Sequence, residues 1–152
     1  PDGTKMAFVS AVAPEFSLLP PEEAMRKNKE KRERMQQDPS SARVFERLFY
    51  RHWDAYVSGL RRHLFVVDVR LGVFGWEAVG VPRDVTPGDR DADPTSATFA
   101  SSENFCFTPD GNHLIFTAVP DRNEAWSTNY DLCRVSIKNR SPQWQSLTQD
   151  NA

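Results

Sequence analysis

A Pro-Asp-Gly turn followed at once by a short apolar strand occurs twice in this chain, at residues 1–3 and 109–111. In such a turn proline presets φ, aspartate bonds to its own backbone, and glycine supplies the positive φ at the exit. The apolar segments that follow, 6–9 and 114–117, place Phe8 and Phe116 at the same offset from the turn. The repetition predicts two copies of one structural unit.

The similarity between the two copies continues along the chain. Residues 63–70 align with 131–138, and both segments have the short apolar pattern of strands. Residues 82–89 align with 144–150, and each contains an apolar residue before threonine, in Val85-Thr86 and Leu147-Thr148. A further strand is expected at 104–108, directly before the second turn.

Four short antiparallel strands that repeat are typical of a propeller blade. We therefore predict an all-β fold of roughly two blades of a β-propeller, each a four-stranded antiparallel sheet. The first blade would span 1–92 and lack its first strand, and the second would span 93–152. A single β-sandwich with a coincidental turn is the alternative.

The first copy carries an insertion, predicted to be mostly helical, at about residues 14–62. Residues 20–35 begin with two prolines and two glutamates, which suit a helix N-terminus. The charged residues that follow indicate a solvated helix with i,i+4 ion pairs, and a basic arm for an acidic partner is the alternative. Val44 and Leu48, like Phe45 and Phe49, have helical spacing, so we expect a second helical segment that packs on the blade.

Four stretches carry a resemblance to a known family: RHWDAYVSGLRRHLFVVDV, PRDVTPGDRDADP, FCFTPDGNHLIFTA and DRNEAWSTNYDLCRV. Together they resemble the N-terminal propeller of the S9 (prolyl oligopeptidase) family of serine peptidases, in particular the dipeptidyl peptidase and acylaminoacyl-peptidase-like enzymes. The resemblance implies a propeller that gates and positions short peptide substrates for a C-terminal α/β-hydrolase domain.

No catalytic residue of that family can be assigned in this chain. A nucleophile elbow has the pattern G-x-S-x-G, and the nearest match, YVSGL, lacks the first glycine. We therefore expect the hydrolase domain, which would be the main partner together with short peptides, to lie outside this chain. A TolB-like or WD40-like propeller that serves as a protein-interaction module is the alternative function.

The loop at 121–129 holds the candidate substrate-binding residues. Glu124 offers a carboxylate for a peptide's free amine, Trp126 an aromatic face for apolar or cation–π contact, and Asn129 a polar side chain. The alternative is that the loop holds this blade to its neighbour, with Trp126 buried and Asn129 capping the loop.

The remaining composition points to few other partners. A net charge of −2 argues against nucleic acid, and no apolar run approaches the length of a membrane span. The three histidines lack metal-ligand spacing, and residues 89–94 depart from a calcium loop, so we predict a polar connection there and neither metal nor cofactor. Cys106 and Cys133 fall on the first and third strands of one blade and should be free, buried thiols. The compartment, cytoplasmic or periplasmic, and the oligomeric state stay open.

Overall fold

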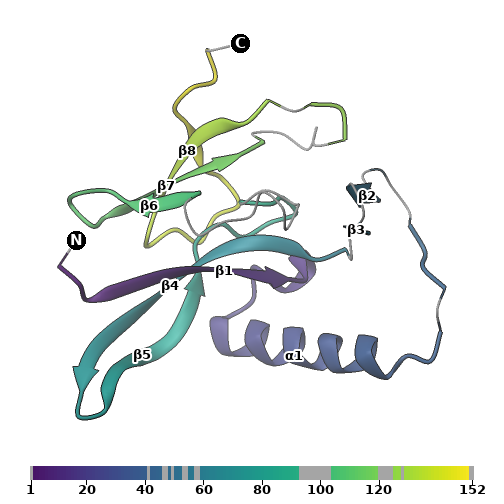
Figure 1. Cartoon of the computed structure of the whole chain (residues 1–152), viewed down its shortest axis with the longest axis horizontal. Helices are drawn as coiled ribbons and strands as arrows, with labels where there is room; N and C mark the ends of the chain where they lie inside the picture. The colour runs from purple at the N-terminus through teal and green to yellow at the C-terminus, as the bar shows by residue number, and fades with distance from the viewer. Residues whose placement is uncertain are drawn as a thin grey trace.

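The computed structural model describes residues 2–40, 42–45, 48, 50–52, 55–56, 59–92, 104–119, 125–127 and 129–150. These residues form two antiparallel sheets, a short two-stranded ribbon and a helix (Figure 1). The predicted β-rich class with a charged helix is confirmed at this level. In chain order the elements are β1 (Lys5–Val12), the 3-10 helix η1 (Pro14–Phe16), α1 (Pro21–Gln37), β2 (Arg51–His52), β3 (Ala55–Tyr56), β4 (Arg61–Gly72), β5 (Gly75–Asp84), β6 (Phe105–Phe107), β7 (His113–Ala118), β8 (Asp131–Ser136) and β9 (Gln145–Ser146).

Within the described residues, the first sheet has the strand order β1-β4-β5 and the second sheet β6-β7-β8-β9. In both sheets each strand pairs with the next strand of its copy, with antiparallel partners throughout. The second sheet contains all four strands expected of one unit. The first sheet contains the counterparts of the last three, as the sequence predicted.

The two sheets share one pairing register. Lys5 of β1 lies opposite Asp68 of β4. His113, at the same offset from its turn as Lys5, lies opposite Ser136 of β8, which aligns with Asp68. The match holds along both strand pairs, so the sequence repeat is also a structural repeat.

The two Pro-Asp-Gly turns are built alike. The backbone N–H of Thr4 donates to Asp2 Oδ1 at 3.0 Å, and that of Asn112 donates to Asp110 Oδ1 at 3.0 Å. The glycines of the two turns have φ of 74° and 68°, the left-handed region that glycine adopts without strain. The aspartate and the glycine therefore perform the same task in each copy.

At the end of each repeat, a threonine hydroxyl accepts the same backbone hydrogen bond. The N–H of Leu64 donates to Thr86 Oγ1 at 2.9 Å, and the N–H of Leu132 donates to Thr148 Oγ1 at 3.0 Å. In both copies the residue before the threonine donates its N–H to the carbonyl of that leucine, at 3.0 Å and 2.7 Å. The alignment of the two leucines and the two threonines is therefore confirmed at the level of single hydrogen bonds.

The main core lies between the two sheets. One face of each sheet contributes apolar side chains, and the apolar residues of the segment after β5 and of the turn after β8 close the cluster. Its buried members are Leu64, Val66, Val85, Ala92, Leu114, Phe116, Ala118, Cys133, Val135 and Ile137. Phe116 meets Trp144 edge-on at 5.2 Å between ring centroids, while the guanidinium of Arg90 lies 3.7 Å from the Trp144 ring centroid. The two sheets thus form one packed body.

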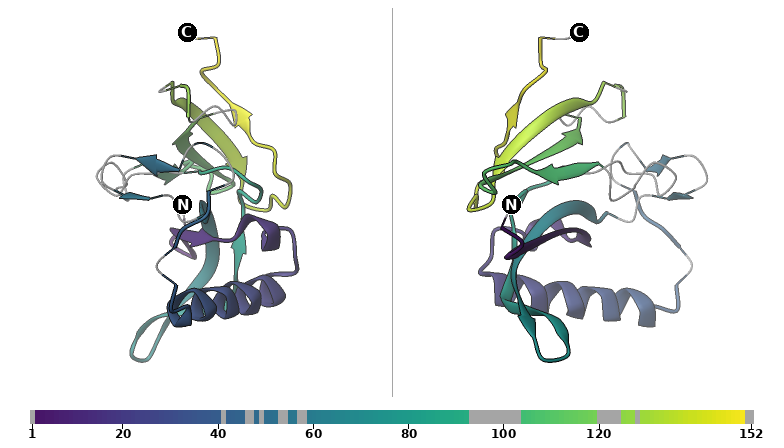
Figure 2. Two further views of the ribbon diagram at one scale, coloured as in Figure 1. Left: turned by 90° about the vertical axis from the view of Figure 1, so that its right-hand side faces the viewer. Right: turned by 60° about the vertical axis from the view of Figure 1, so that its left-hand side comes forward.

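Helix α1 covers the opposite face of the first sheet. In Figures 1 and 2 the first sheet lies between the second sheet and α1. The helix begins with Pro21 and carries Glu22 and Glu23 in its first turn, as predicted from the sequence. It has the expected i,i+4 ion pairs, for example between Arg26 and Glu30 at 2.6 Å. Within the described residues, no helix combines the length and the apolar character needed to cross a bilayer.

The second helical segment predicted around Val44 and Leu48 is wrong for the described residues. Residues 42–45 are not helical, and Val44 and Leu48 are 86% and 56% exposed rather than packed on a sheet. The reason lies upstream, where Asp38 Oδ1 accepts the N–H of Ser40 and Ser40 Oγ accepts the N–H of Ala42. Such side-chain acceptors compete with helical hydrogen bonds and favour turns. Phe49 lies outside the described residues.

The β4–β5 hairpin is longer than the sequence predicted. The alignment of 82–89 with 144–150 predicts a last strand that ends in Thr86, whereas β5 begins at Gly75 and ends at Asp84. Gly75 adopts a φ of 129° after Val73 and Phe74, which allows the tight reversal. The glycines on either side of this pair were the available sequence signal.

Cys106 and Cys133 lie on β6 and β8, with β7 between them. Both thiols are free, as predicted. The predicted burial is correct for Cys133 and wrong for Cys106, whose side chain is exposed. Alternation explains the difference, because Cys106 is flanked by two half-buried phenylalanines and points to the opposite face of β6.

Candidate functional site

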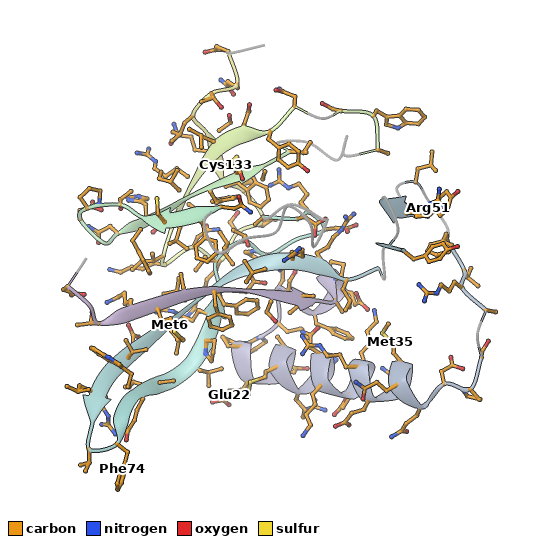
Figure 3. The ribbon with its side chains drawn as sticks, in the orientation of Figure 1. Met6, Glu22, Met35, Arg51, Phe74 and Cys133 are labelled. Carbon is orange, nitrogen blue, oxygen red and sulfur yellow. The ribbon has the colours of Figure 1, made fainter. Side chains whose placement is uncertain are left out.

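The candidate site lies at the end of the sheets where β1 and β7 finish. β1 and β7 are equivalent strands of the two repeats. The insertion that follows Val12 and the loop that follows Ala118 therefore begin at the same end of the two sheets (Figure 1). Figure 3 shows Arg51 of β2 on this side and Phe74, at the tip of the β4–β5 hairpin, on the other. The two irregular segments singled out from the sequence therefore share one end of the fold.

The predicted substrate-binding residues are only partly described. Trp126 is 81% exposed in this chain. Asn129 is exposed, and its backbone N–H donates to Ser127 Oγ at 3.1 Å. Glu124 lies outside the described residues. The structure thus presents an indole face to solvent beside a short polar loop.

An aromatic cluster at the same end was not foreseen from the sequence. The ring of Phe45 lies 5.4 Å from that of Tyr50 and 5.7 Å from that of Tyr56, between centroids. The guanidinium of Arg43 stacks over Tyr56 at 4.7 Å from its centroid. The helical spacing of Phe45 and Phe49 predicts a helix face and gives no sign of this cluster. Flat, partly exposed rings next to a cation suit contact with peptide side chains.

A buried ion-pair network joins the start of β4 to the loop after β5. Arg61, only 9% exposed, donates to Asp89 Oδ1 at 2.8 Å and to Asp91 Oδ2 at 3.0 Å. Asp91 also accepts the N–H of Arg62 at 2.7 Å. Burial raises the pKa of Asp91, although Arg61 and the Arg62 N–H act in the opposite direction. The predicted polar connection at 89–94 is thus built around an arginine in its described part.

His63 and Asp84 form the buried histidine–carboxylate pair of the first sheet. His63 Nδ1 lies 2.6 Å from Asp84 Oδ2, and His63 Nε2 has no hydrogen-bond partner among the described residues. At the corresponding place in the second sheet, Ser146 Oγ donates to Asp131 Oδ2 at 2.6 Å. The bond therefore joins the last two strands of each repeat. Among the described residues, no nucleophilic side chain is hydrogen-bonded to His63 Nε2. The pair therefore links two strands and does not form a catalytic triad with any described residue.

Within the described residues, no three His, Cys, Asp or Glu side chains come together as metal ligands. This end of the molecule presents an exposed indole, an aromatic cluster with an arginine, and polar loop groups.

Comparison with known proteins shows a weak similarity to a curated peptidase. The chain is 24% identical over 83 residues to the protein named Probable dipeptidyl-peptidase 5 of Aspergillus terreus. The match covers 54% of this chain and 12% of that protein, so the chain spans a small part of the relative's length. No protein-family model and no solved structure matches the chain.

Proposed function

We propose that this chain is part of the β-propeller of an S9-type serine peptidase, where it gates and positions short peptides for an α/β-hydrolase domain. The observation that carries the proposal is the similarity to a dipeptidyl-peptidase over 83 residues. The repeated sheet supports it, since propellers are built from four-stranded antiparallel sheets arranged around a channel. In this proposal 1–92 and 93–152 are two successive blades.

Substrate contact is proposed for the loop that holds Glu124, Trp126 and Asn129. A free α-amino group requires a carboxylate partner, and Glu124 supplies one in a loop whose Trp126 is exposed. The aromatic cluster at the same end would contact apolar side chains of the peptide. In this proposal the chain positions and selects the peptide substrate, while the hydrolase domain carries out the acyl-enzyme chemistry.

The proposal is tested in the longer protein with Glu124→Gln, using dipeptide substrates with free and with acetylated N-termini. We expect KM for the free-amine substrate to rise roughly tenfold or more, with KM for the acetylated substrate unchanged, because only the former carries an ammonium group. Glu77→Gln is the matched control, since Glu77 is an exposed glutamate on the far hairpin. An unchanged KM would show that Glu124 does not bind the substrate amine. Absence of any cleavage by the wild-type protein would show that it is not a peptidase.

One observation favours the alternative of a protein-interaction propeller. The tip of the β4–β5 hairpin exposes four large apolar side chains, between 66% and 98%: Leu71, Val73, Phe74 and Trp76. An exposed apolar cluster of this kind marks many interaction sites. A folded longer protein that binds partners through this tip and cleaves no peptide would establish this alternative.

A further inference from the structure

We propose that Arg43 and Arg51, which both adjoin Tyr56, form a binding site for a peptide carboxylate that stands beside an apolar side chain. The carboxylate is that of the peptide's C-terminus or that of an acidic side chain, and the two sources share one chemistry. The inference deepens the proposed function, on which it rests, because it names a second substrate group besides the free amine.

The segment that forms the site is basic in a chain that is acidic overall. Residues 42–51 contain three arginines, Arg43, Arg47 and Arg51, and one acidic residue, Glu46, whereas the whole chain has a net charge of −2. A local excess of positive charge raises the concentration of anions beside it. The composition of this segment therefore favours an anionic ligand.

Arg43 is the first cation of the site. Its guanidinium lies over the ring of Tyr56, with the central carbon 4.7 Å from the ring centroid. Within the described part of the chain, Arg43 has no carboxylate partner. A guanidinium that rests on an aromatic face keeps N–H donors at its edge for a carboxylate. Arg43 is thus held in place while its donors stay available.

Arg51 is the second cation. In the ribbon of β2 and β3 it lies directly opposite Tyr56, so the two side chains project from the same face of the ribbon. Arg51 is exposed, and it forms no ion pair with another described residue. Tyr56 is therefore the common neighbour of two guanidinium groups, and a carboxylate beside its ring would meet both.

The rings next to the two arginines supply the apolar part of the site. Phe45 contacts Tyr50 and Tyr56, with centroids 5.4 Å and 5.7 Å away. All three side chains keep between 39% and 50% of their surface exposed, and an apolar side chain of a ligand can cover this surface. The C-terminal residue of a peptide carries a carboxylate and a side chain on one Cα atom, so it can use the cations and the rings together.

The contact between Arg43 and Tyr56 prepares the site for its ligand. A long cationic side chain loses rotamer freedom when it binds, and a side chain that already rests on a ring loses less of it. The guanidinium fork then donates two parallel hydrogen bonds to one carboxylate. Inorganic phosphate would meet the same charge but would gain nothing from the rings, so peptide carboxylates should bind better than phosphate.

A nuclear magnetic resonance titration of the 152-residue chain tests the proposal with three tripeptides: Ala-Ala-Phe, its C-terminal amide, and amidated Ala-Glu-Phe. We expect Ala-Ala-Phe to bind roughly tenfold or more tightly than its amide, because the amide cannot accept charge-assisted hydrogen bonds. Amidated Ala-Glu-Phe that binds as tightly as Ala-Ala-Phe would support the site and assign its carboxylate to an acidic side chain. Binding as weak as that of Ala-Ala-Phe amide would assign it to the C-terminus.

Substitution of single arginines shows where the carboxylate binds. Arg43→Gln should abolish the preference for the free acid, and Arg43→Lys should restore only part of it, because lysine keeps the charge but lacks the fork. Arg70→Gln is the matched control: it makes the same change at an exposed arginine of the β4–β5 hairpin and should leave the preference unchanged. Arg51→Gln replaces Arg43→Gln should that variant lose its circular dichroism spectrum.

Three results would overturn the proposal. They are equal affinities of the wild type for the free acid and the amide, a preference that survives both Arg43→Gln and Arg51→Gln, and displacement of Ala-Ala-Phe by an equal concentration of inorganic phosphate. The titration measures binding without cleavage. An inactive longer protein would therefore overturn the proposed peptidase and leave a positive binding result in place.

Discussion

The Thr86→Val substitution removes one hydrogen bond from the first sheet and nearly preserves the shape of the side chain. Thr86 and Leu64 are both fully buried, and the bond from Leu64 N–H to Thr86 Oγ1 is 2.9 Å long. In the variant this N–H stays buried without an acceptor, which costs about 1–3 kcal/mol. The added methyl group offsets part of that cost, by up to about 0.8 kcal/mol. We expect a net loss of roughly 1–2 kcal/mol in the free energy of unfolding.

The second copy supplies a matched control for this prediction. Thr148 accepts the N–H of Leu132 at 3.0 Å, but that bond is exposed, so water can replace the hydroxyl in Thr148→Val. Thr148 Oγ1 also lies 3.3 Å from Asp131 Oδ1, and Ser146 continues to hold that carboxylate at 2.6 Å. We expect a change of about 0.5 kcal/mol or less.

Urea unfolding followed by tryptophan fluorescence measures both variants under identical conditions. The prediction is a clearly lower midpoint for Thr86→Val and nearly the wild-type midpoint for Thr148→Val, with unchanged slopes. Equal losses in the two variants, or a larger loss for Thr148→Val, would refute the reasoning. Such a result would mean that the two hydrogen bonds do not differ in burial.

Two further predictions concern single titratable groups. Iodoacetamide should alkylate Cys106 well before Cys133, because Cys106 is exposed. Burial, together with the negative charge of Asp131, raises the pKa of Cys133 to about 11. Peptide mass spectrometry measures the two alkylation rates, and equal rates would contradict the burial of Cys133. Hydrogen bonds, first that from the Thr108 hydroxyl, hold the pKa of Asp110 well below its usual range. Asp110 therefore stabilises the fold above the carboxyl's unfolded pKa of about 3.9, and this contribution is lost as the pH falls toward the lowered value. Asp110→Asn should lower the urea midpoint at neutral pH, and the difference from wild type should shrink in acid; a difference independent of pH would contradict it.

The repeated unit could be predicted from the sequence because its signals are local. Turn chemistry at Asp2 and Asp110 and the apolar residue before each threonine depend on neighbours a few positions away, and the structure repeats them bond for bond. Helix α1 was predicted for the same reason, since proline, glutamates and i,i+4 charges all act within one helix.

The features that the sequence did not reveal depend on distant contacts. Phe45 gathers Tyr50 and Tyr56 into a cluster only because the chain turns after Asp38, so its helical spacing was misleading. The pairing of Arg61 with acidic residues of the loop after β5 joins segments that helical or strand periodicity cannot connect. The packing of α1 over the sheet face that carries Phe8 likewise depends on tertiary contacts.

Peptide cleavage by the proposed longer protein tests the central claim most directly. The measurement is hydrolysis of a panel of dipeptide and acyl-amino-acid chromogenic substrates, with and without a serine-reactive phosphonate. We predict cleavage that the phosphonate abolishes, and the preferred substrates will distinguish dipeptidyl from acylaminoacyl specificity. A folded protein that cleaves none of the panel and takes up no phosphonate would contradict the account and favour a binding propeller.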